Sequence, residues 1–135
     1  MIKQIALSAF FIFAAPPLGK LFAAQSTPVY EGSAALNKWL GVNTRRVRWC
    51  GIYLSKVIAH APRNAASVDA WRHWGHAVNP RNVKGNQVIV IFKHRHVGKL
   101  VSIKGNCILV TSGNDGNAVR TRCRKPNSIR QYRSR

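Results

Sequence analysis

Residues 48–53 read Arg48-Trp49-Cys50-Gly51-Ile52-Tyr53, so that a cysteine directly follows a large aromatic residue. From this point apolar residues recur at three- and four-residue spacing, which is the pattern of an amphipathic helix. The members of this stripe are Trp49, Ile52, Tyr53, Val57 and Ile58. The pattern predicts a helix that runs to about Ala61 and stops before Pro62, because the residue before a proline disfavours helical geometry.

Cys50 is therefore expected in the first turn of a helix, where unpaired backbone N–H groups and the helix dipole favour negative charge. Such a position lowers the pKa of a thiol and populates the nucleophilic thiolate. The alternative is a buried structural cysteine, which is the commoner role of a free thiol. Taken alone, Cys50 favours this alternative, and the case for a nucleophile depends on the rest of the chain.

Composition limits the classes of function. The chain has 135 residues, with 22 Lys and Arg against three acids and a net charge of +19. Its length suggests a single domain, and its hydrophobic content of 46% is enough for a core. The charge predicts attraction to polyanions such as nucleic acid, anionic membranes or an anionic cell wall. So few carboxylates exclude paired-carboxylate catalysis, and the sequence predicts no metal site and no cofactor.

The first 26 residues are typical of a secretory signal peptide. Lys3 supplies the positive start, and residues 5–15 form an uncharged apolar run that is short for a bilayer span. Cleavage after Ser26 fits the preference for small residues, with an uncleaved anchor as the alternative, and residues 27–34 would form a linker. We expect a secreted or periplasmic monomer, without a transmembrane segment in the mature chain, in a compartment where disulfides persist.

The remaining pattern predicts an α+β fold. A short helical segment is expected at residues 34–40 and a second helix from about Ala65 to Trp74. Strands are then predicted at residues 87–92, 96–103, 107–111 and 118–123, with a fifth around residues 129–132. We therefore expect N-terminal helices packed on an antiparallel meander of about five strands.

Three cysteines in an exported chain leave one unpaired unless it bridges two chains. If Thr111 faces Val119 in a hairpin, Cys107 and Cys123 also face each other and are close enough for a disulfide. Cys50 would then be the free thiol. A register slip of one residue would remove this pairing, and two buried thiols are the alternative.

A catalytic cysteine needs a base within hydrogen-bond reach and a polar group that orients the base. Among the five histidines, His96 begins a predicted central strand and is followed by apolar residues that would hold it in place. Asn114 follows the adjacent strand and could orient His96. The alternatives are a surface imidazole for His96 and an ordinary loop residue for Asn114.

Several short motifs together resemble the small papain-like cell-wall hydrolases, which include the NlpC-type and CHAP-type enzymes. The motifs are Trp49-Cys50 opening a helix, His96-Val97-Gly98 opening a strand, and Gly113-Asn114 after the next strand. Residues 70–75 resemble the Trp-x-x-Trp-Gly segment of one branch, and residues 85–92 resemble the strand before the catalytic histidine. The resemblance covers residues 35–133, which would form the peptidase domain.

This resemblance implies a papain-like fold with Cys50 as nucleophile, His96 as general base and Asn114 as orienting residue. It implies hydrolysis of amide bonds in peptidoglycan stem peptides or cross-links, by acyl transfer through a thioester. The sequence departs from the family pattern at Asn86, Arg95 and Asp115. The alternatives are a non-catalytic basic protein that binds cell wall or nucleic acid, and a toxin of the same fold that attacks a rival's wall.

Overall fold

The computed structural model describes residues 28–83 and 87–135. Within these ranges the strands are β1 (Val29–Tyr30), β2 (His76–Val78), β3 (Ile89–Phe92), β4 (Val97–Lys104), β5 (Cys107–Ser112), β6 (Ala118–Arg124) and β7 (Ile129–Ser134). The α-helices are α2 (Ala34–Leu40), α3 (Cys50–Val57) and α4 (Val68–Arg72), and a 3-10 turn, η1, covers Pro126–Ser128. The predicted helix at Cys50 and the strands from β3 to β7 are thus confirmed as elements.

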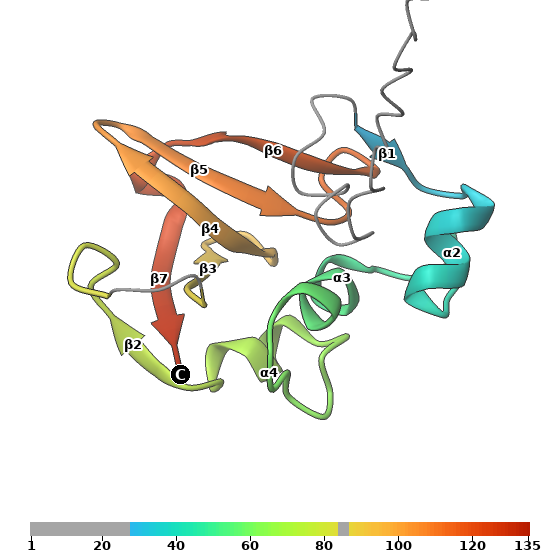
Figure 1. Ribbon diagram of the computed structural model, residues 1–135, viewed down its shortest axis with the longest axis horizontal. Helices are drawn as coiled ribbons and strands as arrows, with labels where there is room; N and C mark the ends of the chain where they lie inside the picture. The colour runs from blue at the N-terminus through green and yellow to red at the C-terminus, as the bar shows by residue number, and fades with distance from the viewer. Residues whose placement is uncertain (1–27, 84–86) are drawn as a thin grey trace, which may run out of the picture.

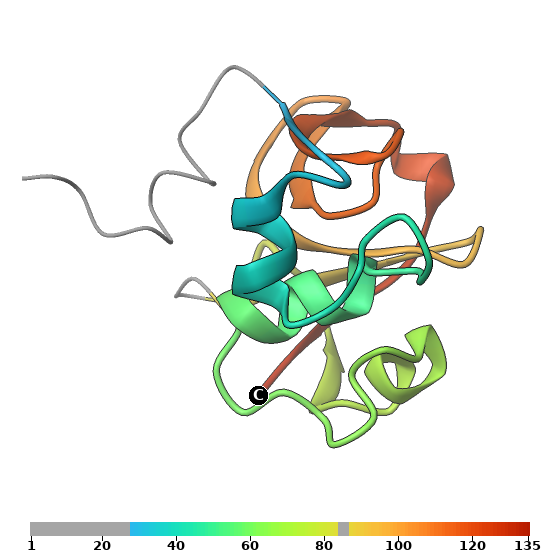
Figure 2. The ribbon, with the colours of Figure 1, turned by 90° about the vertical axis from the view of Figure 1, so that its right-hand side faces the viewer.

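The strands form one antiparallel sheet in the order β1-β6-β5-β4-β3-β7-β2. Figure 1 shows a curved sheet in which the β5–β6 hairpin lies at one end and the β2–β7 pair lies at the other. Figure 2 shows α2 and α3 side by side, and α3 contacts α2, β4 and β5. The start of α3 therefore lies against the centre of the sheet.

The predicted fold class, with helices packed on about five strands in a papain-like arrangement, is wrong. The described chain is mostly a seven-stranded antiparallel sheet, and its helices have only seven, eight and five residues. The two strands that the prediction lacks, β1 and β2, have two and three residues. Such strands are too short to display a two-residue alternation in the sequence.

Helix α3 ends earlier than predicted, and the chain after it supplies acceptors for two tryptophans. Ile58 is already extended, with φ −114° and ψ 132°. The indole N–H of Trp71 donates to the Ala65 carbonyl at 2.8 Å, and that of Trp74 donates to the His60 carbonyl at 2.7 Å. A buried indole N–H usually has such a partner, and the irregular path between α3 and α4 provides one for Trp71 and one for Trp74.

Three apolar clusters hold the helices and the sheet together. The first joins α3 and α4 to β3 and β4 and contains Cys50, Leu54, Ile58, Trp71, Trp74, Ile89, Ile91 and Val97. The second joins α2 and α3 to β6 through Leu36, Leu40, Trp49, Tyr53 and Val119. The third lies on the other side of β3 and contains Val90, Phe92, Ile108, Val110 and Ile129. Strand β3 is buried on both faces, which explains its continuous apolar sequence.

A disulfide joins Cys107 of β5 to Cys123 of β6, with Cα atoms 4.9 Å apart. Cys50 is the remaining, free cysteine, and it is buried. The predicted disulfide is therefore present, although the strand register from which it was inferred is wrong.

The register of the β5–β6 hairpin differs from the expected one. Thr111 pairs with Thr121, whereas Val119 pairs with Val29 of β1. The register is shifted by two residues, and the loop between the strands closes its own turn, in which the N–H of Asp115 donates to the Ala118 carbonyl at 2.9 Å. In this loop Gly113 approaches Trp49 and Tyr53 at the start of α3.

Two sequence predictions concern the N-terminal part of the chain. The predicted signal peptide, residues 1–26, lies outside the described residues. The predicted linker, residues 27–34, contains β1, in which Val29 and Tyr30 pair with β6. Within residues 28–83 and 87–135, no helix has the length and apolar character needed to span a membrane.

Candidate active site

The three residues predicted to form a site, Cys50, His96 and Asn114, line one cavity of about 220 Å³. Cys50 is the first residue of α3, His96 directly precedes β4, and Asn114 follows β5. The fold therefore gathers side chains that lie far apart in the sequence. The other residues of the lining are Arg48, His94, Arg95, Asp115, Gly116 and Arg124.

A glycine allows the loop after β5 to approach the start of α3. A Cβ atom added at Gly113 would lie 2.5 Å from the Cβ atom of Tyr53 and 2.8 Å from a ring carbon of Trp49. Only a glycine fits at such distances. This contact fixes the backbone next to Asn114 against the residue that precedes Cys50.

The backbone of β4 also contacts the cysteine. The N–H groups of Val97 and Gly51 hydrogen-bond to the Cys50 sulfur. Val97 directly follows His96, so this contact brings the sulfur to the part of β4 where the histidine begins the strand. The thiol and the imidazole both line the cavity.

The ionisation of Cys50 differs from the expectation for a helix N-terminus. Cys50 is only 4% exposed, and this burial raises the pKa of its thiol above the ordinary value. Hydrogen bonds from Val97 and Gly51 and the positive charge of Arg48 act in the opposite direction, but they are smaller effects on the pKa. Loss of solvation outweighs the helix terminus, so the resting side chain at neutral pH is the thiol.

His96 is a buried and neutral imidazole. It is 7% exposed, and its Nε2 atom has no hydrogen-bond partner within the described residues. Burial lowers the pKa of His96 to about 4, although the negative charge of Asp115 acts to raise it. At neutral pH the ring is therefore uncharged, which is the form of a general base, while its lowered pKa makes it a weaker proton acceptor than an exposed histidine.

Aromatic stacking fixes the orientation of the His96 ring. Its centroid lies 5.4 Å from that of Phe92 and 5.7 Å from that of His94, and the two imidazole planes differ by 7°. The guanidinium of Arg124 lies over the Phe92 ring, 5.0 Å from its centroid. Stacked rings of this kind lose little freedom when a substrate binds.

Asp115 is a cavity residue to which the sequence prediction assigned no role. Its carboxylate is 5% exposed, accepts a hydrogen bond from Arg122 Nε at 2.9 Å and forms an ion pair with Arg124 at 2.8 Å. Its charge acts on His96. The sequence feature that could have identified Asp115 is its position next to Asn114 in a chain that has only three acidic residues.

Asn114 lines the cavity, as does its neighbour Asp115. Its backbone is in the left-handed region, with φ 52°, which asparagine tolerates better than most residues. Its side chain is partly buried. Among the described residues, Nε2 of His96 has no partner, so Asn114 does not hold that nitrogen.

The buried His96 makes stability depend on pH. The ordinary histidine pKa is about 6.5, and the folded value is about 4, so the unfolded chain binds the proton more tightly. The part of the free energy of unfolding that is linked to neutral His96 is complete above pH 6.5 and is lost as the pH falls toward 4. We expect the free energy of unfolding to fall by about 3 kcal/mol over this range.

Urea unfolding at pH 7, 5.5 and 4.5 measures this effect, with His96→Gln as the control because glutamine does not titrate. The wild type should lose stability toward pH 4.5 more steeply than His96→Gln. Parallel pH profiles for the two proteins would show that His96 is not buried in its neutral form.

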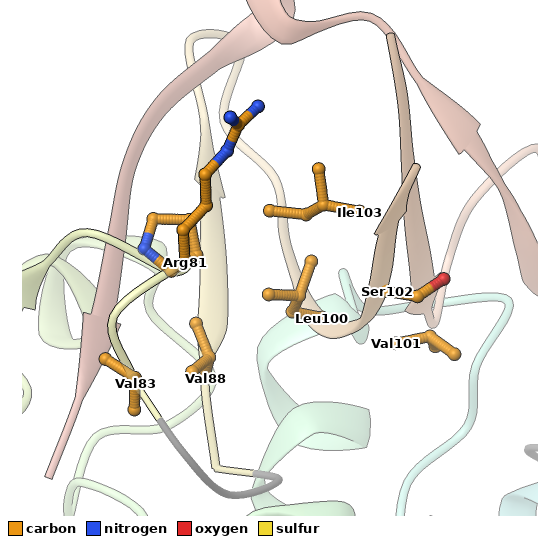
Figure 3. A pocket seen from close by; sticks show the side chains of 8 residues that line it. Arg81, Val83, Val88, Leu100, Val101, Ser102 and Ile103 are labelled. Atoms are coloured by element: carbon orange, nitrogen blue, oxygen red, sulfur yellow. The ribbon is translucent and has the colours of Figure 1, made fainter. Parts of the chain in front are cut away.

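A second cavity, of about 460 Å³, lies beside β4 and shares no lining residue with the first. Figure 3 shows Leu100 and Ile103 pointing across it toward Val83, Val88 and Arg81. Its lining is mostly aliphatic and contains no cysteine or histidine. Among the described residues of this lining, the Ser102 hydroxyl therefore has no histidine or carboxylate beside it that could activate it.

The chemistry of the first cavity thus depends on a thiol and an imidazole. Within residues 28–83 and 87–135, no three His, Cys, Asp or Glu side chains are grouped so that they could hold a metal ion. Of the groups that line the cavity, Cys50 carries the thiol and His96 carries the buried imidazole. No family model, curated protein or solved structure matches this chain.

Proposed function

We propose that this protein is an exported cysteine peptidase or amidase that hydrolyses amide bonds in peptidoglycan peptides. The observation that carries the proposal is that Cys50 and His96 line the same cavity, in which His96 Nε2 is buried without a partner. Cys50 would act as nucleophile and His96 as general base. Asn114 would orient the His96 ring when substrate is bound.

The proposed reaction starts from a neutral pair, the Cys50 thiol and the His96 imidazole. The sulfur attacks the carbonyl carbon of the scissile amide while His96 accepts the thiol proton. His96 then gives this proton to the leaving nitrogen as the C–N bond breaks, which leaves a thioester on Cys50. Water, deprotonated by His96, attacks the thioester and releases a carboxylic acid and the free thiol.

The first turn of α3 offers donors for the negative oxygen that forms during this attack. The first N–H groups of a helix have no partner within the helix, and here they belong to Cys50 and Gly51. The Gly51 N–H contacts the Cys50 sulfur in the resting protein and would exchange it for the oxyanion. Backbone N–H groups aimed at a developing oxyanion are a large source of rate acceleration in acyl transfer. The N–H groups at the start of α3 would thus stabilise the negative charge of the transition state more than they stabilise a thiolate at Cys50.

The substrate class rests on charge and on sequence motifs. A net charge of +19 favours an anionic cell wall, and the predicted signal peptide favours a secreted or periplasmic location. The order of Trp49-Cys50, His96-Val97-Gly98 and Gly113-Asn114 resembles that of NlpC-type and CHAP-type enzymes. Together these features point to peptide amides of peptidoglycan.

Digestion of purified muropeptides tests this proposal, with products separated by mass. The wild type should release shortened peptides, whereas Cys50→Ala and Cys50→Ser should reduce the rate by roughly 10³-fold because each lacks the thiol. Thermal unfolding of the three proteins serves as the control for folding. Equal product release by wild type and Cys50→Ala would exclude Cys50 as the nucleophile.

A second candidate function is non-catalytic binding of an anionic polymer, either cell wall or nucleic acid. It is favoured by the exposed basic run at residues 45–48, where Arg45, Arg46 and Arg48 all face solvent. Salt-sensitive retention on cell wall or DNA that is unchanged in Cys50→Ala, together with no hydrolysis by the wild type, would favour this function.

A further inference from the structure

We propose that the cavity contains an anion subsite formed by Arg48, with Arg95 at its edge, and that the acyl donor carries a free carboxylate next to the scissile amide. The substrate part of this inference rests on the proposed function. The subsite itself rests on the charges that surround Cys50, and it can be tested without any hydrolysis.

Arg48 lies beside the nucleophile. It is exposed, lines the cavity together with Cys50 and His96, and precedes Cys50 by two residues. Its positive charge acts on the Cys50 sulfur. A carboxylate that pairs with Arg48 would therefore sit within the same cavity as the attacked carbonyl.

The chain does not neutralise Arg48 itself. Within the described residues, Arg48 takes part in no ion pair. Asp115 is occupied by Arg122 and Arg124. Arg48 is thus available to an anion from outside.

Arg95, at the edge of the cavity, is only weakly held. Its pairing with Asp69 spans 3.4 Å between side chains that are 69% and 50% exposed. Such an exposed pair contributes little and is readily exchanged. Arg95 is therefore free to turn toward a bound anion.

The chemistry of the two side chains selects the ligand. A guanidinium binds a carboxylate through two parallel hydrogen bonds and remains charged at all relevant pH values. Peptides carry carboxylates on side chains and at chain ends, so a peptide acyl donor can present one near its scissile amide. The inferred substrate is an acidic peptide rather than a neutral one.

Alkylation of Cys50 tests the subsite directly, because the remaining two cysteines form a disulfide and only Cys50 presents a thiol. Iodoacetate carries the carboxylate and iodoacetamide is its neutral analogue. We expect the ratio of the iodoacetate rate to the iodoacetamide rate to fall roughly tenfold in Arg48→Gln, since one nearby charge is lost. Arg46→Gln is the matched control: Arg46 is an exposed arginine of the same basic run that does not line the cavity, and its replacement should leave the ratio unchanged.

An equal ratio in wild type, Arg48→Gln and Arg46→Gln would overturn the subsite, as would a Cys50 that neither reagent reaches. Muropeptides with a free carboxylate or a carboxamide beside the cleaved bond then test the substrate. Arg48→Gln should raise KM about tenfold for the acid and leave the amide unchanged. If alkylation by iodoacetate depends on Arg48 but no muropeptide is cleaved, the subsite stands and the proposed function is refuted. If muropeptides are cleaved but alkylation does not depend on Arg48, the proposed function stands and the subsite is refuted.

Discussion

Replacing His96 by alanine is expected to lower kcat/KM for amide hydrolysis by roughly 10³-fold, because a general base contributes about this much. The imidazole is buried at 7% exposure and its pKa is lowered to about 4. It is therefore uncharged at neutral pH, which is the form that a general base needs before it accepts the thiol proton. Steady-state kinetics on a muropeptide, measured from pH 5 to 8, provide the rate.

His94→Ala is the matched control for this prediction. His94 also lines the cavity and stacks on His96, with ring centroids 5.7 Å apart, but it is exposed. Its replacement should change kcat/KM by less than about tenfold, since it only supports the orientation of the ring. A larger loss of kcat/KM in His94→Ala than in His96→Ala would indicate that His94 is the base and would refute the assignment of His96.

Replacing Asp115 by asparagine is expected to lower the free energy of unfolding by about 2 to 3 kcal/mol. The carboxylate is 5% exposed and pairs with Arg124, whose side chain is 18% exposed, and with Arg122, which is 48% exposed. Loss of one partner leaves a charge without compensation in a largely buried place. The share of Arg122 is smaller because water screens it. Urea unfolding at pH 7 measures the change.

Asp69→Asn provides the comparison, because Asp69 also pairs with two arginines, Arg72 and Arg95. Its side chain is 50% exposed, so its loss should cost less than about 1 kcal/mol. Asp115→Asn should in addition lower the pKa of His96 further, because the Asp115 charge raises that pKa in the wild type. Equal stability losses in the two variants would show that Asp115 is not buried.

The elements around the site follow from local sequence patterns. The stripe that starts at Trp49 predicts α3, and the helix begins at Cys50. The apolar run that ends at Phe92 predicts β3, which is buried throughout. His96 then directly precedes β4. Strong periodicity and turn residues are local signals, and they are enough to place these groups at the ends of their elements.

The sheet as a whole could not be predicted, because it depends on contacts between distant segments. Val29–Tyr30 becomes a strand only by pairing with β6, and His76–Val78 only by pairing with β7. The register of Thr111 depends on a turn that closes inside the loop. Strand pairing of this kind leaves no mark in a segment of two or three residues.

The electrostatics of the site also depended on burial that the sequence does not show. A helix N-terminus favours a thiolate, but the apolar cluster around Cys50 raises its pKa instead. Asp115 and Arg124 come together because the loop that carries Asp115 lies against β6. A sequence pattern identifies the reacting groups, whereas their protonation states follow from the fold.

The central claim is that Cys50 and His96 act as one unit, and a double-mutant cycle on muropeptide hydrolysis tests it most directly. Groups that act together in catalysis show strongly non-additive losses. We predict the same residual rate for Cys50→Ala, His96→Ala and the double variant. A wild-type rate in His96→Ala, or a double variant slower than Cys50→Ala by the full factor measured for His96→Ala, would contradict the claim.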